Sequence, residues 1–160
     1  MTALYVRAGR KYAAATAEVI LGHARDLLDR QFRCGTRVLD NPLLIETFLK
    51  EKLASREHEI FALILLDGRE RLIKYLEIAR GTLHGVEVFP REIVKIALAH
   101  NAANVVLVHN HPSGESKPSP GDIEFTRTVQ RALALVDVKV VDHFIVGKKM
   151  TSLLLSGLHR

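Results

Sequence analysis

Cysteine is nearly absent from this sequence, in which Cys34 is the only one. A single cysteine cannot form a disulfide within the chain, which fits a reducing compartment better than secretion. It also excludes a zinc deaminase, because that metal site needs the pattern P-C-x-x-C. The sequence therefore predicts a cytoplasmic protein whose chemistry does not use paired thiols.

Aromatic residues are also scarce, with six Phe, three Tyr and no Trp, so the chain offers few platforms on which nucleic-acid bases can stack. The net charge is +5, but the basic residues are scattered and form no arginine-rich run. This charge permits an acidic partner without requiring one. Weak DNA association through a basic surface therefore stays open as a competing function.

Long apolar runs are missing as well. The longest, Ile60–Leu66, is far shorter than the roughly 20 residues that cross a bilayer. No long apolar stretch follows the basic residues near the N-terminus, so no signal peptide is expected. With 48% hydrophobic and 26% charged residues, the composition is that of a globular protein able to bury a sizeable core, with no membrane partner.

The most informative stretch is 105–122, V-V-L-V-H-N-H-P-S-G-E-S-K-P-S-P-G-D. Its start is a buried-strand pattern that runs into His109 and His111, and residues two apart on a strand point the same way. Ser119 and Asp122 complete the pattern H-x-H-x7-S-x-x-D. Two imidazoles and a carboxylate with an open fourth position are typical of a catalytic zinc, although manganese or iron would also accept these ligands. We expect one Zn²⁺ per chain, held by His109, His111 and Asp122.

The end of this stretch also has a purely structural interpretation. Ser119 followed by Pro120 and, three residues after the serine, Asp122 is typical of a helix start, with Ser119 as the N-cap. The two interpretations are compatible, because a helix N-terminus is a firm mount for a ligand carboxylate. The Pro- and Gly-rich loop would bring Asp122 back towards the histidines.

Together these residues resemble the JAMM motif of MPN-domain metallopeptidases and, more closely, the bacterial RadC family. The resemblance covers about residue 43 to the C-terminus. Further matching segments are Gly81-Thr82, Glu87-Val88, Pro90-Arg91-Glu92-Ile93, Asp142-His143 and Val146-Gly147. It implies an α/β (α+β) fold in which a mixed β-sheet packs with helices, and an enzyme that cleaves a peptide or isopeptide bond.

The resemblance also implies a general base upstream of the metal ligands. The RadC-like pattern of glutamate, one residue, phenylalanine and then an apolar strand selects Glu59, with Glu57 as second choice. Glu59 would take a proton from the attacking water and pass it to the leaving amine. Ser119 would donate a hydrogen bond to the oxyanion that develops on the substrate. His143 would lie near the site as a core histidine and not as a ligand.

The sequence departs from the family pattern at two places. Phe89 replaces the histidine of the usual V-H-P-R-E segment, so any function of that histidine is absent or moved. Full-length RadC-like proteins carry a helix-hairpin-helix DNA-binding region, and 1–40 shows no such G-h-G hairpin. We expect an N-terminal helical extension at 1–40, which packs or forms a homo-oligomer, and an MPN domain at 41–160.

Periodicity and turn residues predict little regular structure at 1–10 and a mixed sheet with helices against it elsewhere. The expected helices are 11–32, 42–52, 91–102 and 122–135, and the expected strands are 59–66, 71–80, 86–89, 105–108, 138–146 and 150–155.

Two other functions compete with the hydrolase interpretation. The letters H-N-H at 109–111 cannot form an HNH nuclease site, because that motif spreads its residues over a hairpin and a helix. A catalytically silent MPN binding module stays open, but such domains typically lose a ligand or the base. Here Glu59, His109, His111, Ser119 and Asp122 fill all five positions, which favours an active enzyme. Its peptide or protein substrate is not identified by these residues.

Overall fold

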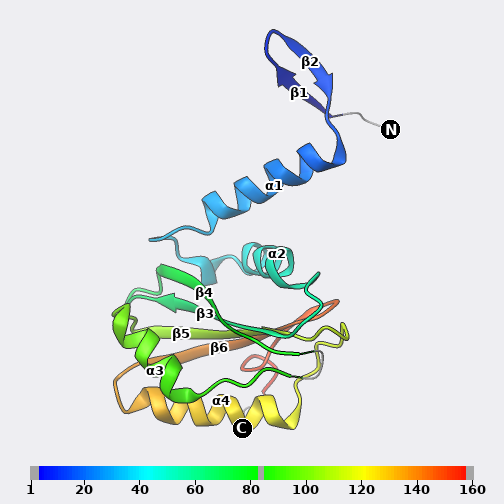
Figure 1. The fold of residues 1–160 in the computed structure, drawn as a ribbon. Coiled ribbons are helices and arrows are strands. Elements are labelled where there is room, and N and C mark those ends of the chain that lie inside the picture. The colour runs from blue at the N-terminus through cyan, green and yellow to red at the C-terminus, as the bar shows by residue number, and fades with distance from the viewer. Residues whose placement is uncertain (1–3, 83–84, 158–160) are drawn as a thin grey trace.

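The computed structural model describes residues 4–82 and 85–157 of the chain, which form an α/β fold (Figure 1). Its helices are α1 (Ala17–Gln31), the short 3-10 helix η1 (Val38–Asp40), α2 (Pro42–Leu53), α3 (Pro90–Ala99) and α4 (Pro120–Ala134). Its strands are β1 (Tyr5–Ala8), β2 (Lys11–Ala14), β3 (Ile60–Leu66), β4 (Leu72–Arg80), β5 (Asn104–Asn110), β6 (Lys139–Val146) and β7 (Met150–Ser152). Among these described elements no helix is both long and apolar enough to cross a membrane.

A five-stranded mixed sheet in the order β4-β3-β5-β6-β7 forms the centre of the fold. The β5–β6 pair is parallel and the other neighbours are antiparallel. Every residue of β3 is buried, as an apolar run covered on both faces requires. The predicted mixed sheet with helices against it is therefore confirmed.

Alternation along the central strands divides the core into two layers. Ile64 and Val106 face the side that α2 covers, whereas Leu63 and Leu107 face the side covered by α3 and α4. The same parity puts His109 on the α4 face of β5 and directs Asn110 towards the other face. The strand thus determines from which side a ligand can approach His109.

The N-terminal prediction was wrong in detail. Residues expected to lack regular structure pair with 11–14 as the hairpin β1–β2, which turns at Gly9 with a φ of +64°. The helix expected from residue 11 begins only at Ala17, because the Thr16 side chain accepts a hydrogen bond from the backbone N–H of Val19 and caps it.

Helix α1 lies apart from the sheet, and the hairpin projects beyond it (Figure 1). Along the described helix no residue is buried. Two ion pairs join it to α2, Arg25–Glu51 at 2.8 Å and Lys52–Asp29 at 3.0 Å. The predicted packing of this helix is thus seen against α2, while homo-oligomer formation stays a prediction.

Three other boundaries differ from the prediction. The segment 86–89, expected as a strand, is irregular: Phe89 is extended before Pro90, but the segment joins no β-ladder. Helix α3 ends at Ala99 because the chain enters the left-handed region at Asn101, with a φ of 50°. Strand β7 ends at Ser152, where the chain turns.

Candidate metal centre

Strand β5 presents His109 at the edge of the α4 face, where the imidazole is 1% exposed. Its neighbours in the sheet are Phe61 on β3 and Ile145 on β6. The next ligand candidate, His111, follows the strand, and its backbone N–H donates to the Val146 carbonyl at 2.9 Å. The pair of histidines is therefore tied to the sheet through its backbone.

The loop after the strand fixes the orientation of His111. The Nδ1 atom of His111 lies 2.8 Å from the Glu115 carbonyl oxygen. A carbonyl only accepts, so Nδ1 of the neutral imidazole carries the proton and Nε2 keeps a free lone pair. Gly114 allows this tight loop through a φ of +82°, and its N–H donates to the His111 carbonyl at 2.9 Å. Ser113 and Gly114 thus shape the loop, as expected.

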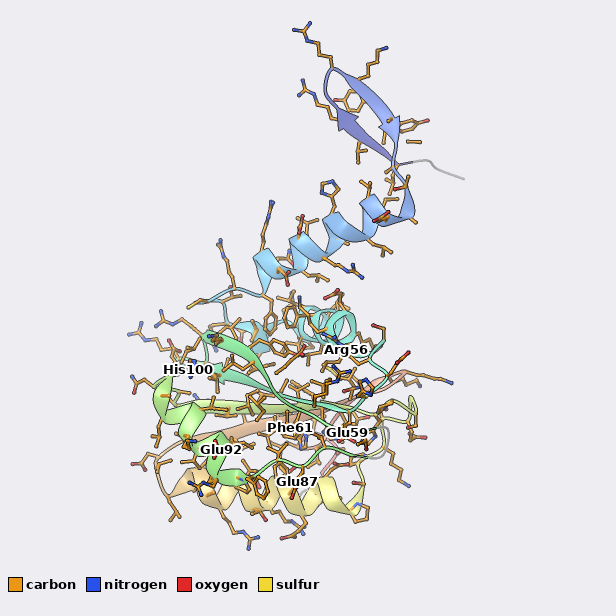
Figure 2. The ribbon with its side chains drawn as sticks, in the orientation of Figure 1. Arg56, Glu59, Phe61, Glu87, Glu92 and His100 are labelled. Atoms are coloured by element: carbon orange, nitrogen blue, oxygen red, sulfur yellow. The ribbon has the colours of Figure 1, made fainter. Side chains whose placement is uncertain are left out.

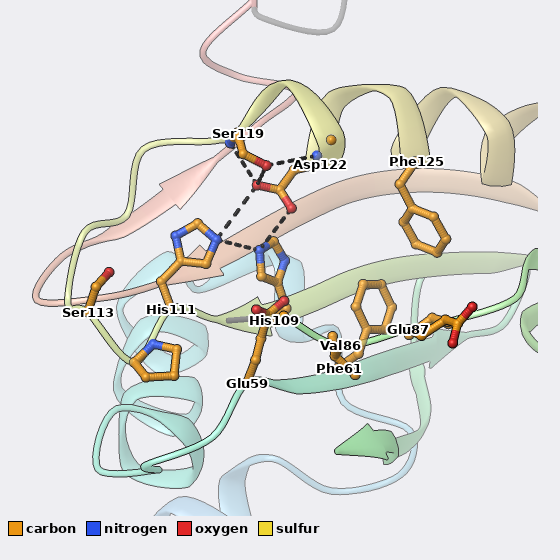
Figure 3. Close-up of a pocket in the computed structure, with 14 residues that line it drawn as sticks. Glu59, Phe61, Val86, Glu87, His109, His111, Ser113, Ser119, Asp122 and Phe125 are labelled. Atoms are coloured by element: carbon orange, nitrogen blue, oxygen red, sulfur yellow. Dashed lines mark hydrogen bonds and ion pairs between the residues drawn. The ribbon is translucent and has the colours of Figure 1, made fainter. Parts of the chain in front are cut away.

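Asp122 approaches the histidines from the first turn of α4 (Figure 3). Its Oδ1 lies 3.3 Å from Nε2 of His109, and its Oδ2 lies 3.6 Å from Nε2 of His111. The two Nε2 atoms are 2.9 Å apart. Ser119 and Asp122 form a capping box, so the predicted helix start is confirmed at the same residues.

These atoms suit a metal ion chemically. One ligand atom from each of His109, His111 and Asp122 lies within 4.8 Å of the other two. Two imidazole nitrogens and a carboxylate directed at one point create a negative potential there that a metal cation would neutralise. Two histidines and a carboxylate also form one of the ligand sets of catalytic zinc. The donor set therefore fits a metal ion with N/O ligands.

The same convergence shifts the acid–base properties of the residues. Burial would raise the pKa of Asp122, but the neighbouring His109 and His111 imidazoles and the Ser119 hydroxyl hold it well below its usual range. The Asp122 carboxylate in turn raises the pKa of His111 above the ordinary 6.5. An ionised carboxylate is the protonation state that a metal ligand requires.

Glu59 lies immediately before β3 and lines the same pocket as His109 and Asp122. Its carboxyl is half-buried, and burial raises its pKa above the ordinary 4.5 although His109 and His111 act in the opposite direction. The pKa is therefore moved towards the range useful for a general base. Glu57 lines a different, neighbouring pocket together with Arg56.

The residues next to the two glutamates lie in different places. Figure 2 places Glu59, Phe61 and Glu87 on the α4 side and Arg56 on the α2 side. The equal parity of the two glutamates does not direct Glu57 to the metal centre, because the strand begins only at Ile60. Of the two base candidates, Glu59 is the one that the fold brings to the centre.

The pocket around the metal centre has a volume of about 530 Å³. Phe61, Val86, Val88 and Phe125 give it an apolar side, and Ser119 stands at its polar side. Its remaining charged side chains are carboxylates. Among the pocket-lining residues within 4–82 and 85–157, none is Lys or Arg.

Two further residues lie behind the centre, and only one of them was expected from the sequence. His143 is completely buried and lies 2.8 Å from Nδ1 of His109, so it is a hydrogen-bonded core histidine behind the centre, as expected. Thr126 was missed, although its hydroxyl lies 2.6 Å from the other ring nitrogen of His143. Its spacing of four residues from Asp122 puts both on one helix face, but its contact with His143 depends on the packing of α4 against β6.

Comparison with known proteins identifies relatives of this chain. The family model described as RadC-like JAB domain matches residues 39–158. A UPF0758 protein of Aromatoleum aromaticum is 48% identical over 136 residues, which is 85% of this chain and 59% of the relative. A UPF0758 protein of Cellvibrio japonicus is 45% identical over 130 residues, 81% of this chain and 58% of the relative. The chain thus spans less than two thirds of the length of these relatives.

Proposed function

The chain belongs to the RadC-like JAB domain family, and we propose that it is a zinc-dependent hydrolase that cleaves a peptide or isopeptide bond. The observation that carries this proposal is the convergence of His109, His111 and Asp122 beside a half-buried glutamate, Glu59. A metal and a base in one pocket are what hydrolysis by an activated water requires.

His109 Nε2, His111 Nε2 and an Asp122 oxygen would hold the metal, leaving its remaining position for water and substrate. A zinc ion bound there would supply a coordinated water with a pKa near ~7 and a Lewis acid for the carbonyl. Asp122 contributes a negative charge that stays in place over the working pH range, because its pKa lies well below its usual range.

Glu59 performs the proton transfers in this proposal. Its raised pKa and its half-buried position allow it to accept a proton from the attacking water and to return it to the leaving amine nitrogen. Ser119 is exposed at the pocket, and its hydroxyl donates to Asp122 Oδ2 at 2.7 Å. In the proposal this hydroxyl turns from Asp122 to the oxyanion of the tetrahedral intermediate when the substrate is bound. One such donor typically contributes about 3 kcal/mol to transition-state stabilisation.

The pocket favours an amide over a phosphodiester as substrate. Its described charged residues other than the histidines are Glu59, Glu87 and Asp122, and carboxylates repel a phosphate backbone. Phe61 and Phe125 form an apolar wall suited to a side chain next to the scissile bond. A peptide or protein in the cytoplasm is therefore the proposed substrate.

DNA association is the competing function and would use a surface other than this pocket. The net charge of +5 permits it. It would be supported if the logarithm of the DNA association constant falls linearly with the logarithm of the salt concentration. The slope of that line is set by the number of phosphates contacted.

Elemental analysis of the purified protein tests the metal centre directly. We expect about one zinc per chain in the wild type. The variants His111→Ala and Asp122→Ala should lose the metal, and His23→Ala, a change of an exposed histidine on α1, should keep it. Zinc at about 100 times its Kd should stabilise the wild type by about 2.7 kcal/mol and leave both ligand variants unchanged.

Screening of peptide and isopeptide libraries then tests the reaction, with Glu59→Ala as the inactive control. Cleavage by the zinc-loaded wild type but not by zinc-loaded Glu59→Ala would support the hydrolase. A wild type that takes up no metal even after reconstitution would contradict it and favour a catalytically silent binding module.

A further inference from the structure

A continuous series of buried hydrogen bonds lies behind His109, on the side away from the pocket. The Nδ1 of His109 lies 2.8 Å from Nε2 of His143. The Nδ1 of His143 lies 2.6 Å from the Thr126 hydroxyl, which donates to the Asp122 backbone carbonyl at 2.6 Å. The series begins at one proposed metal ligand and ends on the backbone of another.

We infer that Thr126 and His143 are positioning residues that hold His109 with its Nδ1 protonated and its Nε2 lone pair directed at the metal centre. This inference deepens the proposed function and rests on it, because the free Nε2 matters as a metal ligand. Neither residue is itself one of the three converging ligands.

The direction of each hydrogen bond in the series follows from the Asp122 backbone carbonyl at its end. The Asp122 carbonyl can only accept, so the single hydroxyl proton of Thr126 is directed at it. The Thr126 oxygen is then left to accept from His143. His143 must therefore carry a proton on Nδ1.

The other nitrogen of His143 is bare because the imidazole is neutral. His143 is 0% exposed, and neither of its ring nitrogens contacts a carboxylate: their partners are the His109 ring and the Thr126 hydroxyl. The nearby carboxylate of Asp142 is occupied elsewhere, by the backbone N–H groups of His143 and Leu154 and by the Ser152 hydroxyl. A buried imidazolium without a counter-charge is strongly unfavourable.

His143 thus accepts at Nε2, so His109 donates from Nδ1 and presents a bare Nε2 to Asp122 and His111. Ring packing supports the same orientation, since the Phe61 ring lies parallel to the His109 ring with centroids 6.1 Å apart. Phe61 also meets the His143 ring edge-on at 5.8 Å. The Asp122 backbone carbonyl therefore determines the tautomer of His109 through the side chains of Thr126 and His143.

Long-range ¹H–¹⁵N NMR of histidine-labelled, metal-free protein tests this tautomer without any need for activity. In the wild type at alkaline pH, Nδ1 of His109 should carry a proton. In Thr126→Val, the oxygen that accepts from His143 is lost. The nearby Asp122 carboxylate then favours a proton on Nε2 of His109, so we expect the population to shift towards that tautomer.

Zinc affinity, measured by competition with a chelator, is the second measurement. Thr126→Val should weaken zinc binding about 10- to 100-fold, the usual effect of losing an outer hydrogen bond to a metal ligand. Thr126→Ser keeps the hydroxyl and should restore both tautomer and affinity. The matched control is Thr128→Val on the same helix, where the hydroxyl also donates four residues back, to Glu124, but contacts Arg131 instead of His143.

A wild-type His109 with an unprotonated Nδ1 would overturn the inference, and so would a Thr126→Val variant with unchanged zinc affinity. Those results would leave the hydrolase proposal intact. Conversely, the predicted tautomer and zinc effects in a protein that cleaves no peptide would support the positioning role and contradict the hydrolase. The wild-type spectrum decides the tautomer even if Thr126→Val fails to fold.

Discussion

The Ser119 hydroxyl donates a hydrogen bond to Oδ2 of Asp122 across 2.7 Å, and the backbone N–H of each residue bonds the side chain of the other. The residues that begin α4 are therefore the residues that hold the proposed ligand carboxylate in place. The capping box orients Asp122 before any metal arrives, so little ordering remains to oppose metal binding.

Replacement of Ser119 separates its two roles. Ser119→Ala should destabilise the fold by about 1 kcal/mol, whereas Ser119→Gly should cost only about a few tenths of a kcal/mol, because glycine is a tolerated N-cap. Both variants lack the hydroxyl and should lose roughly 10²-fold or more in kcat if it stabilises the oxyanion. Urea unfolding and steady-state kinetics measure the two effects. Full activity in Ser119→Gly would restrict the serine to capping.

Glu59→Gln should abolish proton transfer while leaving the metal ligands untouched. We expect kcat to fall by about 10²- to 10⁴-fold, the usual contribution of a general base, with zinc content unchanged. Glu57→Gln is the matched control, because Glu57 lines the neighbouring pocket. A comparable loss in the control, or an active Glu59→Gln, would argue against the assignment of the base.

Gly147 lies where the β6–β7 turn meets the loop that carries His111. A Cβ atom at Gly147 would lie 2.5 Å from the Gly114 carbonyl oxygen, and that carbonyl accepts the Lys148 N–H at 2.8 Å. Gly147→Ala should displace the loop, lower the free energy of unfolding by about 1–3 kcal/mol and weaken zinc binding. Thermal unfolding and chelator competition measure both effects. Gly68→Ala is the control: a Cβ atom there would meet only the Ala103 Cβ at 4.0 Å, so neither stability nor zinc binding should change.

The turn between β3 and β4 should make stability depend on acid pH. Hydrogen bonds from the backbone and side chain of Arg71, with one from the backbone of Arg69, lower the pKa of Asp67 from 3.8 to about 2. A carboxyl with a depressed pKa in the folded state stabilises above its unfolded pKa, and this contribution is lost as the pH falls towards about 2.

Asp67→Asn should therefore flatten the acid dependence of stability. Urea midpoints of the metal-free protein between about pH 5 and pH 2 measure it. Asp26→Asn, on the exposed side of α1, is the control and should keep the wild-type dependence. Parallel curves for wild type and Asp67→Asn would contradict the role of these hydrogen bonds.

Local patterns in the sequence were sufficient to predict the cluster of His109, His111 and Asp122. Strand alternation predicted that His109 and His111 act together, and the cap pattern predicted Ser119 as the N-cap of α4, as the structure has it. These features depend on neighbours within a few residues, so backbone geometry alone determines them. The mixed sheet followed from long apolar runs such as Ile60–Leu66, which must be buried on both faces.

Contacts between distant segments were decided only by the tertiary structure. Sequence parity left Glu57 and Glu59 equivalent, and they separated into two pockets because β3 begins at Ile60. The hydrogen bonds from His109 through His143 to Thr126 join β5, β6 and α4, and no spacing within one element predicts such a series. Sequence periodicity specifies which face of an element a side chain occupies, whereas the packing of elements specifies which side chains share that space.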